Sequence, residues 1–226
     1  SGAVMAAALL AVALAAFFFF LAFVQPMVRM IEAWKRLGAG DFAVRLDERL
    51  SDERQALIDA FNETVPVLAD HVRLQRSLEL AQEVQQNLLP AAPPDIDGLD
   101  VAGVSISCDE TGGDYFDYRV VSRGGAVCLD TAVGDVTGHG VPSALLMATA
   151  RALLLATEDS ETPSGRVRRA NRLLCRDVGD SGRFMTLLAM EIRPGEGLAR
   201  YVRAGHDPAL CYDPARGVFE EWPGAG

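Results

Sequence analysis

The stretch "VGDVTGHGVPSALLMATARALLLAT" occupies residues 133–157. An apolar, strand-like run ends on Gly134-Asp135, two more glycines follow within five residues, and a long apolar helical pattern begins at Pro142. Glycine permits tight turns and close backbone approach, and proline in a first helical turn sacrifices no hydrogen bond. Packing alone gives no reason for an acid at this junction, so Asp135 is a candidate functional residue held between a strand and a helix.

Two further clusters share this glycine-framed character: "ETGGDYFDY" at residues 110–118 and "RAGHDPAL" at residues 203–210. Asp114 again stands between glycines and an apolar run. Carboxylates in such places suit hard divalent cations, and two acids at the ends of neighbouring strands repel each other unless a cation lies between them. Each cluster alone could be a tight turn with a capping Asp, but three in one region favour a metal site.

The surrounding pattern is one of strands, then helices, then strands. Short β-like runs occupy residues 99–107, 115–122, 126–133, 184–192, 198–203 and 209–212, and the two helical stretches are 142–157 and 162–178. This order predicts an α+β fold with antiparallel sheets.

The N-terminal region has the composition of a membrane span. Residues 3–24 contain no charge, and at about 1.5 Å per residue they would cross a hydrocarbon core of about 30 Å. A signal peptide would have a shorter apolar region and a basic start. Basic residues instead follow the run, at Arg29, Lys35 and Arg36, which predicts a transmembrane helix at residues 1–25 with the remainder in the cytoplasm.

Composition argues against several classes of function. The net charge of −10 and the absence of a long basic run argue against nucleic acid as a partner. The four cysteines are widely spaced, form no CxxC pair and lie in no phosphate-cradling loop, which argues against a zinc site and a cysteine-based phosphatase. His71 in "DHVRLQRS" lacks the Glu and Pro of a kinase phosphoacceptor box, which argues against a sensor kinase. The motif "GGDYF" has Tyr where diguanylate cyclases need an acid, which argues against a cyclase.

Residues 26–73 read as helix, loop and helix. The glycines of "GAGDF" break the first helix, Ser51-Asp52-Glu53 begins the second, and Ile58, Phe61, Val65, Leu68 and Val72 follow coiled-coil spacing. Together with Pro26 and "FNET", this segment resembles a HAMP linker, the signal-relay module of bacterial receptors. The resemblance implies a parallel homodimer built on a four-helix bundle.

The apolar stripe changes phase after Val72. It resumes on Leu74, Leu78, Ala81 and Leu88, before the Pro-rich "AAPPDIDG". A change of phase locally unwinds or overwinds a coiled coil. Residues 74–90 are therefore either a helix that stops pairing and packs on its own domain or a two-state signalling helix.

Residues 80–212 resemble the SpoIIE/RsbU-type serine/threonine phosphatases of the PPM (protein phosphatase 2C-type) superfamily. The matching blocks occur in family order: "LAQEVQQNLLP", "GGDYFDY", "VGDVTGHGVPSALLMA", "FMTLLAMEI" and "RAGHDPAL". The resemblance implies a partial PPM-type α-β-β-α sandwich at residues 91–226, with a site for two Mn²⁺ or Mg²⁺ ions.

Transferred by position, the resemblance assigns Asp114 and Asp135 as metal ligands, with Asp135 bridging both ions and Val136 offering its backbone carbonyl. His139 matches a proposed general acid. Asp117 and His206 lie in family blocks without an assigned role. The implied reaction is metal-assisted hydrolysis, in which a water between two cations attacks phosphorus.

The resemblance also implies a setting and a partner. It predicts a protein of the bacterial inner (cytoplasmic) membrane whose substrate is a phosphorylated STAS-domain protein. The family's further metal acids lie downstream of "FEEWPGAG", so we expect residues 91–226 to be an incomplete phosphatase domain with little or no activity by itself. The alternative is a catalytically inactive phosphatase fold that serves as a binding module in a sensor protein.

Overall fold

The computed structural model describes residues 2–106, 111–156 and 162–224. The chain divides into two compact units, Ser1–Arg76 and Ser77–Gly226.

The first unit begins with one continuous helix. It comprises α1 (Gly2–Phe19), a π-helical turn η1 (Phe20–Val24) and α2 (Gln25–Gly38). This helix is long and apolar enough to cross a membrane, and its most apolar window buries no residue within the chain. A helix that is apolar on all sides suits either a protein core or a bilayer, and exposure of every side chain of α1 fits the bilayer.

Helices α2 and α3 (Arg54–Gln86) enclose the core of the first unit with the segment between them. The buried residues are Met30, Ala33, Leu37, Val44, Leu46, Ile58, Phe61 and Val65. The predicted helix–loop–helix is therefore present, although the HAMP assignment itself stays a prediction. In the predicted coiled-coil seam Leu68 is exposed and Ala69 is buried instead.

Two polar side chains fix this unit. The Asn62 carboxamide pairs with the backbone of Leu46, accepting from its N–H at 3.0 Å and donating to its carbonyl at 2.8 Å. Pro26 has no N–H for the carbonyl of Ala22, four residues earlier in the helix. The Arg54 guanidinium donates to that carbonyl at 2.5 Å and lies over the Phe23 ring, 4.4 Å from its centroid.

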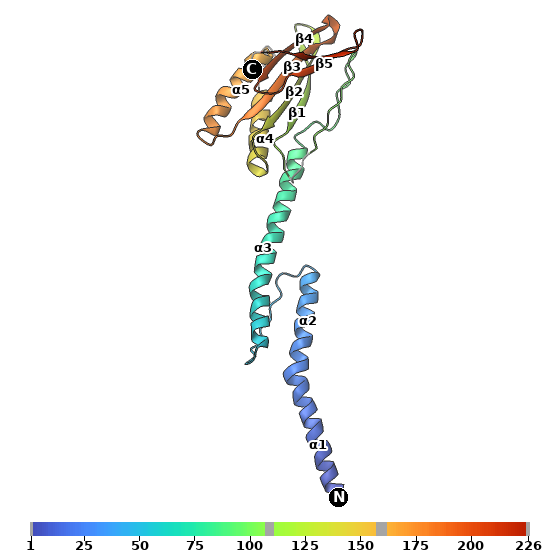
Figure 1. Ribbon diagram of the computed structural model, residues 1–226, viewed down its shortest axis with the longest axis vertical. Helices are drawn as coiled ribbons and strands as arrows, with labels where there is room; N and C mark the ends of the chain where they lie inside the picture. Colours follow the sequence, from blue (N-terminus) through green and yellow to red (C-terminus); the bar gives the residue numbers. More distant parts are fainter. Residues whose placement is uncertain (1, 107–110, 157–161, 225–226) are drawn as a thin grey trace. The chain divides into compact units, whose positions relative to one another are not determined.

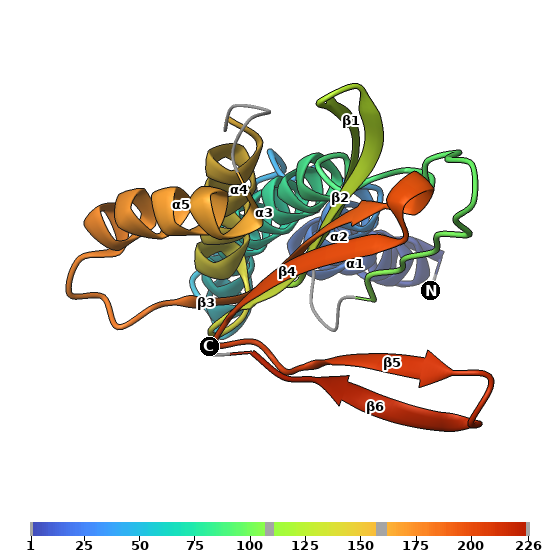
Figure 2. The same ribbon diagram turned by 90° about the horizontal axis from the view of Figure 1, so that it is seen from above.

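The second unit contains a four-stranded antiparallel sheet in the order β1-β2-β3-β4. The strands are β1 (Tyr115–Arg123), β2 (Ala126–Val136), β3 (Met185–Arg193) and β4 (Leu198–Ala204). Helices α4 (Val141–Leu155) and α5 (Pro163–Val178) cover one face of this sheet (Figures 1 and 2). Their shared core contains Tyr115, Val136, Met147, Val167, Leu187 and Ala189.

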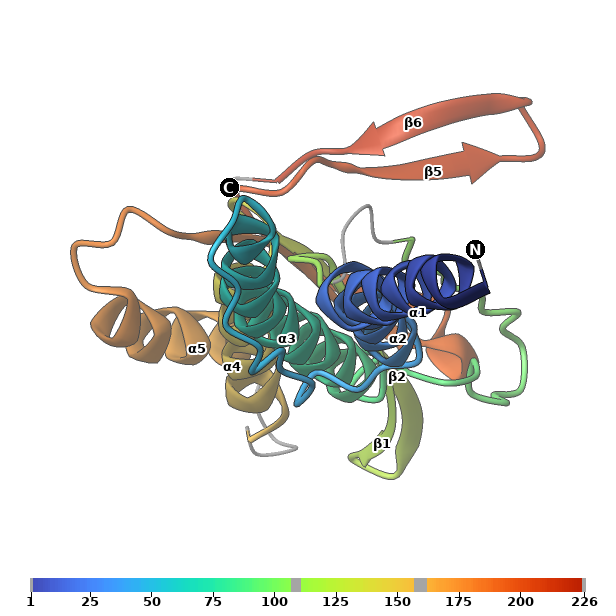
Figure 3. The ribbon, with the colours of Figure 1, turned by 90° about the horizontal axis from the view of Figure 1, so that it is seen from below.

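A separate hairpin of β5 (Ala209–Asp213) and β6 (Val218–Trp222) extends away from α4 and α5 (Figure 3). The predicted α+β class is confirmed, and each predicted strand and helix from residue 115 onward is present. The strand expected at residues 99–107 is wrong for its described part, 99–106, which forms only one isolated bridge between Leu99 and Ile96.

Charged residues lie inside the second unit as well as on its surface. Asp130 on β2 accepts from Arg123 on β1 at 2.7 Å and from Arg166 on α5. Arg123 also donates to Glu191 on β3 at 2.8 Å, and Arg193 donates to the same carboxylate. Asp130 is 6% exposed and Glu191 is 2% exposed, so these ion pairs are largely shielded from water.

Candidate metal centre

The pairing of β1 with β2 brings two acids together. Tyr115 lies opposite Gly134, and the Val136 N–H donates to the Gly113 carbonyl at 3.3 Å. Continuing that register places Asp114 opposite Asp135. Although Asp114 is exposed by surface area, partial desolvation by its neighbours raises the pKa of its carboxyl, and the negative charge of Asp135 raises that pKa further. This mutual repulsion is what a divalent cation between the two carboxylates would relieve.

The flanking glycines are required by close backbone contacts. A Cβ atom at Gly113 would lie 2.6 Å from the Val136 carbonyl oxygen, and one at Gly134 would lie 2.8 Å from the Thr186 carbonyl oxygen. Such distances exclude any side chain without movement of the backbone. The glycines therefore let the strands approach closely at the two acids, and they bring the Val136 carbonyl, a predicted ligand, into the same turn.

The loop after Asp135 is anchored to the start of β3. The Thr137 N–H donates to the Phe184 carbonyl at 3.0 Å, and the Phe184 N–H donates to the Thr137 hydroxyl at 3.1 Å. Gly138 and Gly140 have φ angles of 85° and 74°, in a region that favours glycine. His139 is exposed between them, and its predicted role as general acid stays a prediction.

The third glycine-framed cluster, "RAGHDPAL" at residues 203–210, is hydrogen-bonded to this end of the sheet by way of Thr186. Thr186 lies opposite Asp135 in the pairing of β2 with β3, and its hydroxyl donates to the Asp135 carbonyl at 3.4 Å. The same hydroxyl lies 2.8 Å from Nδ1 of His206. The structure thus connects His206 to the backbone of Asp135. The sequence analysis missed Thr186, although the block "FMTLLAMEI" contains it.

Arg183, which carries no signal in the sequence, also lies at this loop. Its Nη1 atom would lie 3.5 Å from a Cβ atom built on Gly138, so the guanidinium stands against the loop that follows Asp135. Arginine presents planar donors suited to phosphate oxygens.

The donor atoms present are those a hard cation takes: two carboxylates and backbone carbonyls. Within residues 2–106, 111–156 and 162–224, no three His, Cys, Asp or Glu side chains gather into a group that could hold a metal. A six-coordinate Mn²⁺ or Mg²⁺ ion would therefore need oxygen ligands beyond Asp114, Asp135 and the Val136 carbonyl. The donor atoms of these residues are therefore of the type that binds such an ion.

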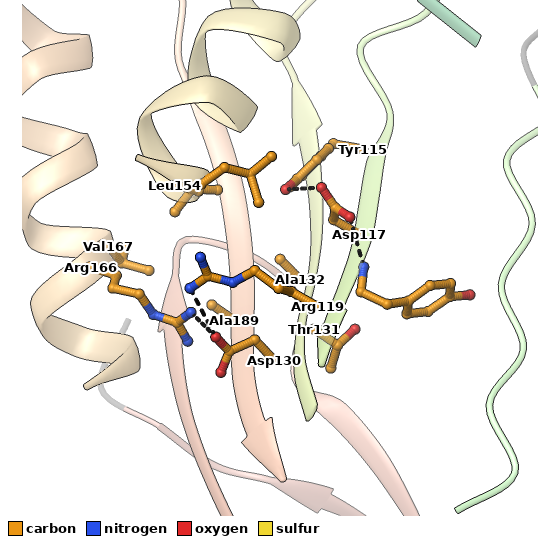
Figure 4. A pocket seen from close by; sticks show the side chains of 12 residues that line it. Tyr115, Asp117, Arg119, Asp130, Thr131, Ala132, Leu154, Arg166, Val167 and Ala189 are labelled. Atoms are coloured by element: carbon orange, nitrogen blue, oxygen red, sulfur yellow. Dashed lines mark hydrogen bonds and ion pairs between the residues drawn. The ribbon is translucent and has the colours of Figure 1, made fainter. Parts of the chain in front are cut away.

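Asp117 belongs to a different site. It lies two residues from Tyr115 along β1, on the face that α4 covers, and its carboxylate is 3.2 Å from Arg151 and accepts from the Tyr115 hydroxyl at 3.3 Å. Figure 4 shows this carboxylate in a small cavity of about 40 Å³ whose other end holds Asp130 and Arg166. Strand alternation places Asp114 on the opposite face, so Asp117 is a structural ion-pair partner.

Neutralising Asp114 should stabilise the metal-free protein. Because the folded state raises the pKa of Asp114, its charge opposes folding at neutral pH. We expect Asp114→Asn to raise the melting temperature by roughly 1–3 °C, a small change because the side chain is exposed. Differential scanning fluorimetry with and without Mn²⁺ measures this: Mn²⁺ should stabilise the wild type more than the variant. A lower melting temperature for Asp114→Asn, with Asp177→Asn unchanged, would contradict the repulsion.

Comparison with known proteins bears on the second half of the chain. Residues 126–225 match the family model described as Stage II sporulation protein E (SpoIIE). The chain is 27% identical over 154 residues to the phosphoserine phosphatase RsbU of Bacillus subtilis (strain 168), covering 68% of this chain and 44% of that protein. It is 28% identical over 165 residues to the phosphoserine phosphatase RsbP of the same organism, covering 65% of this chain and 40% of that protein.

The chain spans less than half the length of these curated relatives. Two solved structures resemble it in part. One contains the RsbU and RsbW domains of Rv1364c from Mycobacterium tuberculosis, with a TM-score of 0.44, 25% identity, and coverage of 54% of this chain and 33% of that one. The other is the SiaA-PP2C domain of Pseudomonas aeruginosa, with a TM-score of 0.43, 19% identity, and coverage of 60% and 54%.

Proposed function

We propose, from the premise that residues 126–225 form a SpoIIE-family domain of the RsbU-type PPM phosphatases, that this protein is a metal-dependent protein serine/threonine phosphatase in signal transduction. The observation that carries the proposal is the placement of Asp114 opposite Asp135 at the ends of paired strands. The packing of Gly113 and Gly134 against neighbouring carbonyls holds that placement.

In the proposed mechanism, residues of this chain bind the metal ions and orient the substrate phosphate. The carboxylates of Asp114 and Asp135 and the carbonyl of Val136 would hold two Mn²⁺ or Mg²⁺ ions. When bound, such ions lower the pKa of water and neutralise charge on phosphoryl oxygens. Arg183, beside the Gly138 loop, attracts the phosphate group of the substrate. His139 supplies a proton to the departing seryl oxygen. Thr186 holds the Asp135 backbone in place.

The proposed setting is the bacterial inner membrane. The helix Gly2–Gly38 would provide the anchor, residues 26–73 would form a dimeric HAMP linker, and the phosphatase domain would face the cytoplasm. Arg29, Lys35 and Arg36, after the apolar run, support this orientation. The proposed substrate is a serine-phosphorylated STAS-domain protein, supported by the two relatives named phosphoserine phosphatases.

Phosphate release tests the proposal. The full-length protein in detergent is mixed with a STAS-domain protein phosphorylated on serine, and inorganic phosphate is measured with Mn²⁺, with Mg²⁺ and with EDTA. We expect release with a divalent cation and a drop to background, at least about 100-fold, after chelation. Release that persists undiminished in EDTA would refute the metal-dependent mechanism.

A second candidate function is a catalytically inactive binding module. The observation that favours it is that only two acids of the proposed centre come together among the described residues. This alternative predicts that the protein binds the phosphorylated partner without releasing phosphate in any metal. Stoichiometric binding by calorimetry together with absent hydrolysis would support it over the enzyme.

A further inference from the structure

Helix α5 carries a row of arginines on the side that faces away from the core. Its buried residues are Pro163, Arg166, Val167 and Ala170. At about 100° per residue, Arg168, Arg172 and Arg176 lie within about 50° of the direction opposite to those buried residues. All three are exposed, and Figures 2 and 3 show α5 at the margin of the second unit. These three residues form the arginine stripe, which is about 12 Å long.

No acid on α5 balances the arginine stripe. The helix contains five arginines and a single acid, Asp177, although the whole chain has a net charge of −10. Among the residues that the structure describes, the three guanidinium groups of the stripe form no ion pair or hydrogen bond. Arg172 lies four residues from both Arg168 and Arg176, a spacing at which like charges destabilise a helix. Stability of α5 therefore gives no reason for the stripe.

The C-terminal end of α5 is linked by a short loop to the acid pair. Residues 179–184 join α5 to β3, and six residues span at most about 22 Å. At the end of this loop, Phe184 is hydrogen-bonded to Thr137, which follows the acid pair on β2 by two residues. A small folded domain is about 30 Å across. A phosphoprotein of that size, with its phosphoserine at the acid pair, is large enough to contact the arginine stripe as well.

The chemistry of the arginine stripe suits a partner with carboxylates. Each guanidinium group presents paired N–H donors that match carboxylate oxygens, and neighbouring members of the stripe are about 6 Å apart along the helix. Three such groups match a row of Asp or Glu side chains on a protein surface. Nucleic acid or a membrane is an extended anionic surface that would also meet the many acids of this chain, so a local acidic patch is the better complement.

We propose that Arg168, Arg172 and Arg176 form a docking surface for a row of acidic side chains on the phosphoprotein substrate. This inference rests on the proposed function and names its substrate class: a folded phosphoprotein with Asp or Glu side chains that lie apart from the phosphoserine. The acid pair acts on the phosphate group, which every such substrate carries. The arginine stripe adds affinity for those phosphoproteins that have the acidic row, and thereby selects among them.

Steady-state kinetics of the full-length protein in detergent test the inference. The substrates are a serine-phosphorylated STAS-domain protein of net negative charge and p-nitrophenyl phosphate, which has no protein surface. In the triple variant Arg168→Gln/Arg172→Gln/Arg176→Gln we expect KM for the phosphoprotein to rise about 10–30-fold, with kcat within about twofold of wild type. Both constants for p-nitrophenyl phosphate should stay as in the wild type. An unchanged KM for the phosphoprotein beside an active wild type would overturn the docking surface and leave the phosphatase proposal standing.

Matched variants separate charge at the stripe from charge in general. The control Arg49→Gln/Arg73→Gln/Arg216→Gln removes the same number of positive charges at exposed positions outside α5, and it should keep the wild-type KM. Replacing the three arginines of the stripe with lysine keeps their charge and should restore most of the affinity. Raising the ionic strength from about 0.05 M to 0.5 M should raise KM for the wild type and the control but hardly change it for the stripe variant. An equal salt effect in all three would contradict the proposal.

Thermal unfolding tests whether the arginines serve folding instead. Because the glutamine substitutions remove repulsion between like charges, the stripe variant should melt at no lower a temperature than the wild type. A lower melting temperature would show that the arginines stabilise the fold, and it would overturn the inference.

Binding in EDTA gives a readout that does not need catalysis. By fluorescence anisotropy, the labelled phosphoprotein should bind the wild type about 10-fold more tightly than the stripe variant, and equal binding would overturn the docking surface. A wild type that releases phosphate from neither substrate would overturn the phosphatase proposal, and anisotropy would then decide the docking surface alone. If the stripe variant lost binding to phosphatidylglycerol vesicles but bound the phosphoprotein as the wild type does, the stripe would belong to a membrane contact and the inference would fail.

Discussion

Replacing Asp135 with alanine should lower Mn²⁺-dependent phosphate release by about 10³-fold or more, on the order of 4 kcal/mol in activation free energy. Asp135 is the proposed ligand shared by both ions, and its backbone is fixed by pairing with Thr186 on β3 and by the register with β1. Removing the carboxylate leaves Asp114 as the remaining acid of the pair. We expect weaker metal binding and slower chemistry together, whereas loss of a substrate contact would mainly raise KM.

The measurement is the steady-state rate of phosphate release at saturating substrate across a range of Mn²⁺ concentrations. Asp177→Ala is the control, because it removes an exposed acid of α5 in the same unit. The control should retain wild-type release. If Asp135→Ala kept more than half of the wild-type rate at every Mn²⁺ concentration, the acid pair would not be the metal centre. Circular dichroism of both variants should match wild type, since Asp135 is exposed.

Replacing Asp130 with asparagine should lower the free energy of unfolding of the second unit by about 3–5 kcal/mol. Asparagine keeps the shape but removes the charge that offsets Arg123 and Arg166, which are 8% and 7% exposed. The two guanidinium groups would remain largely buried, but without the carboxylate charge that offsets the cost of removing them from water. Urea unfolding followed by Trp222 fluorescence, in a Trp34→Phe background, reports this unit, since Trp222 stacks on Tyr201 of β4.

The pH dependence gives a second check on Asp130. Burial by itself would raise the pKa of this carboxyl, but the hydrogen bonds from Arg123 and Arg166 outweigh burial and lower it. A lowered folded-state pKa means that the stabilisation is present above the unfolded value near 3.9 and is lost as pH falls through the folded value. The gap in stability between wild type and Asp130→Asn should therefore stay constant from pH 7 to 5 and narrow below about pH 4.

The control for this network is Glu196→Gln. Glu196 forms an exposed ion pair with Arg193 at 3.3 Å, and such pairs contribute below about 1 kcal/mol. If Asp130→Asn lowered the free energy of unfolding by as little as Glu196→Gln does, the buried charges would not be coupled to folding.

The sequence allowed prediction of features that have local signals. Strand alternation and helical periodicity located the strands β1 to β5 and the helices α4 and α5, but not the 3-10 turn at Pro194–Glu196, and glycines close to an acid singled out Asp114 and Asp135. The strand expected at residues 99–107 failed because alternating apolar residues form a strand only beside a partner. Val104 and Ile106 are instead 78% and 82% exposed.

Other features depended on contacts between distant residues. Asp130 and Glu191 carry no local sign of burial, since charged residues in strands usually face solvent. Their burial follows from Arg123 on β1 and Arg166 on α5, which are close only in the folded chain. Gln85 lies in the block "LAQEVQQNLLP", but its hydrogen-bond partner Gly112 is 27 residues away, so this contact could be found only in the folded structure.

On α3, the Gln85 side-chain amide donates to the Gly112 carbonyl at 2.5 Å and accepts from the Gly112 N–H at 3.2 Å, so this contact joins two neutral groups. Changes in ionic strength screen charges and leave such a pair almost untouched, and neither group titrates between pH 5 and 9. The acid pair two residues further on behaves differently, because protons and cations both act on it. The two neighbouring contacts therefore differ in kind: protons and cations change the interaction between the two acids, whereas solution conditions that act on charge leave the amide contact in place.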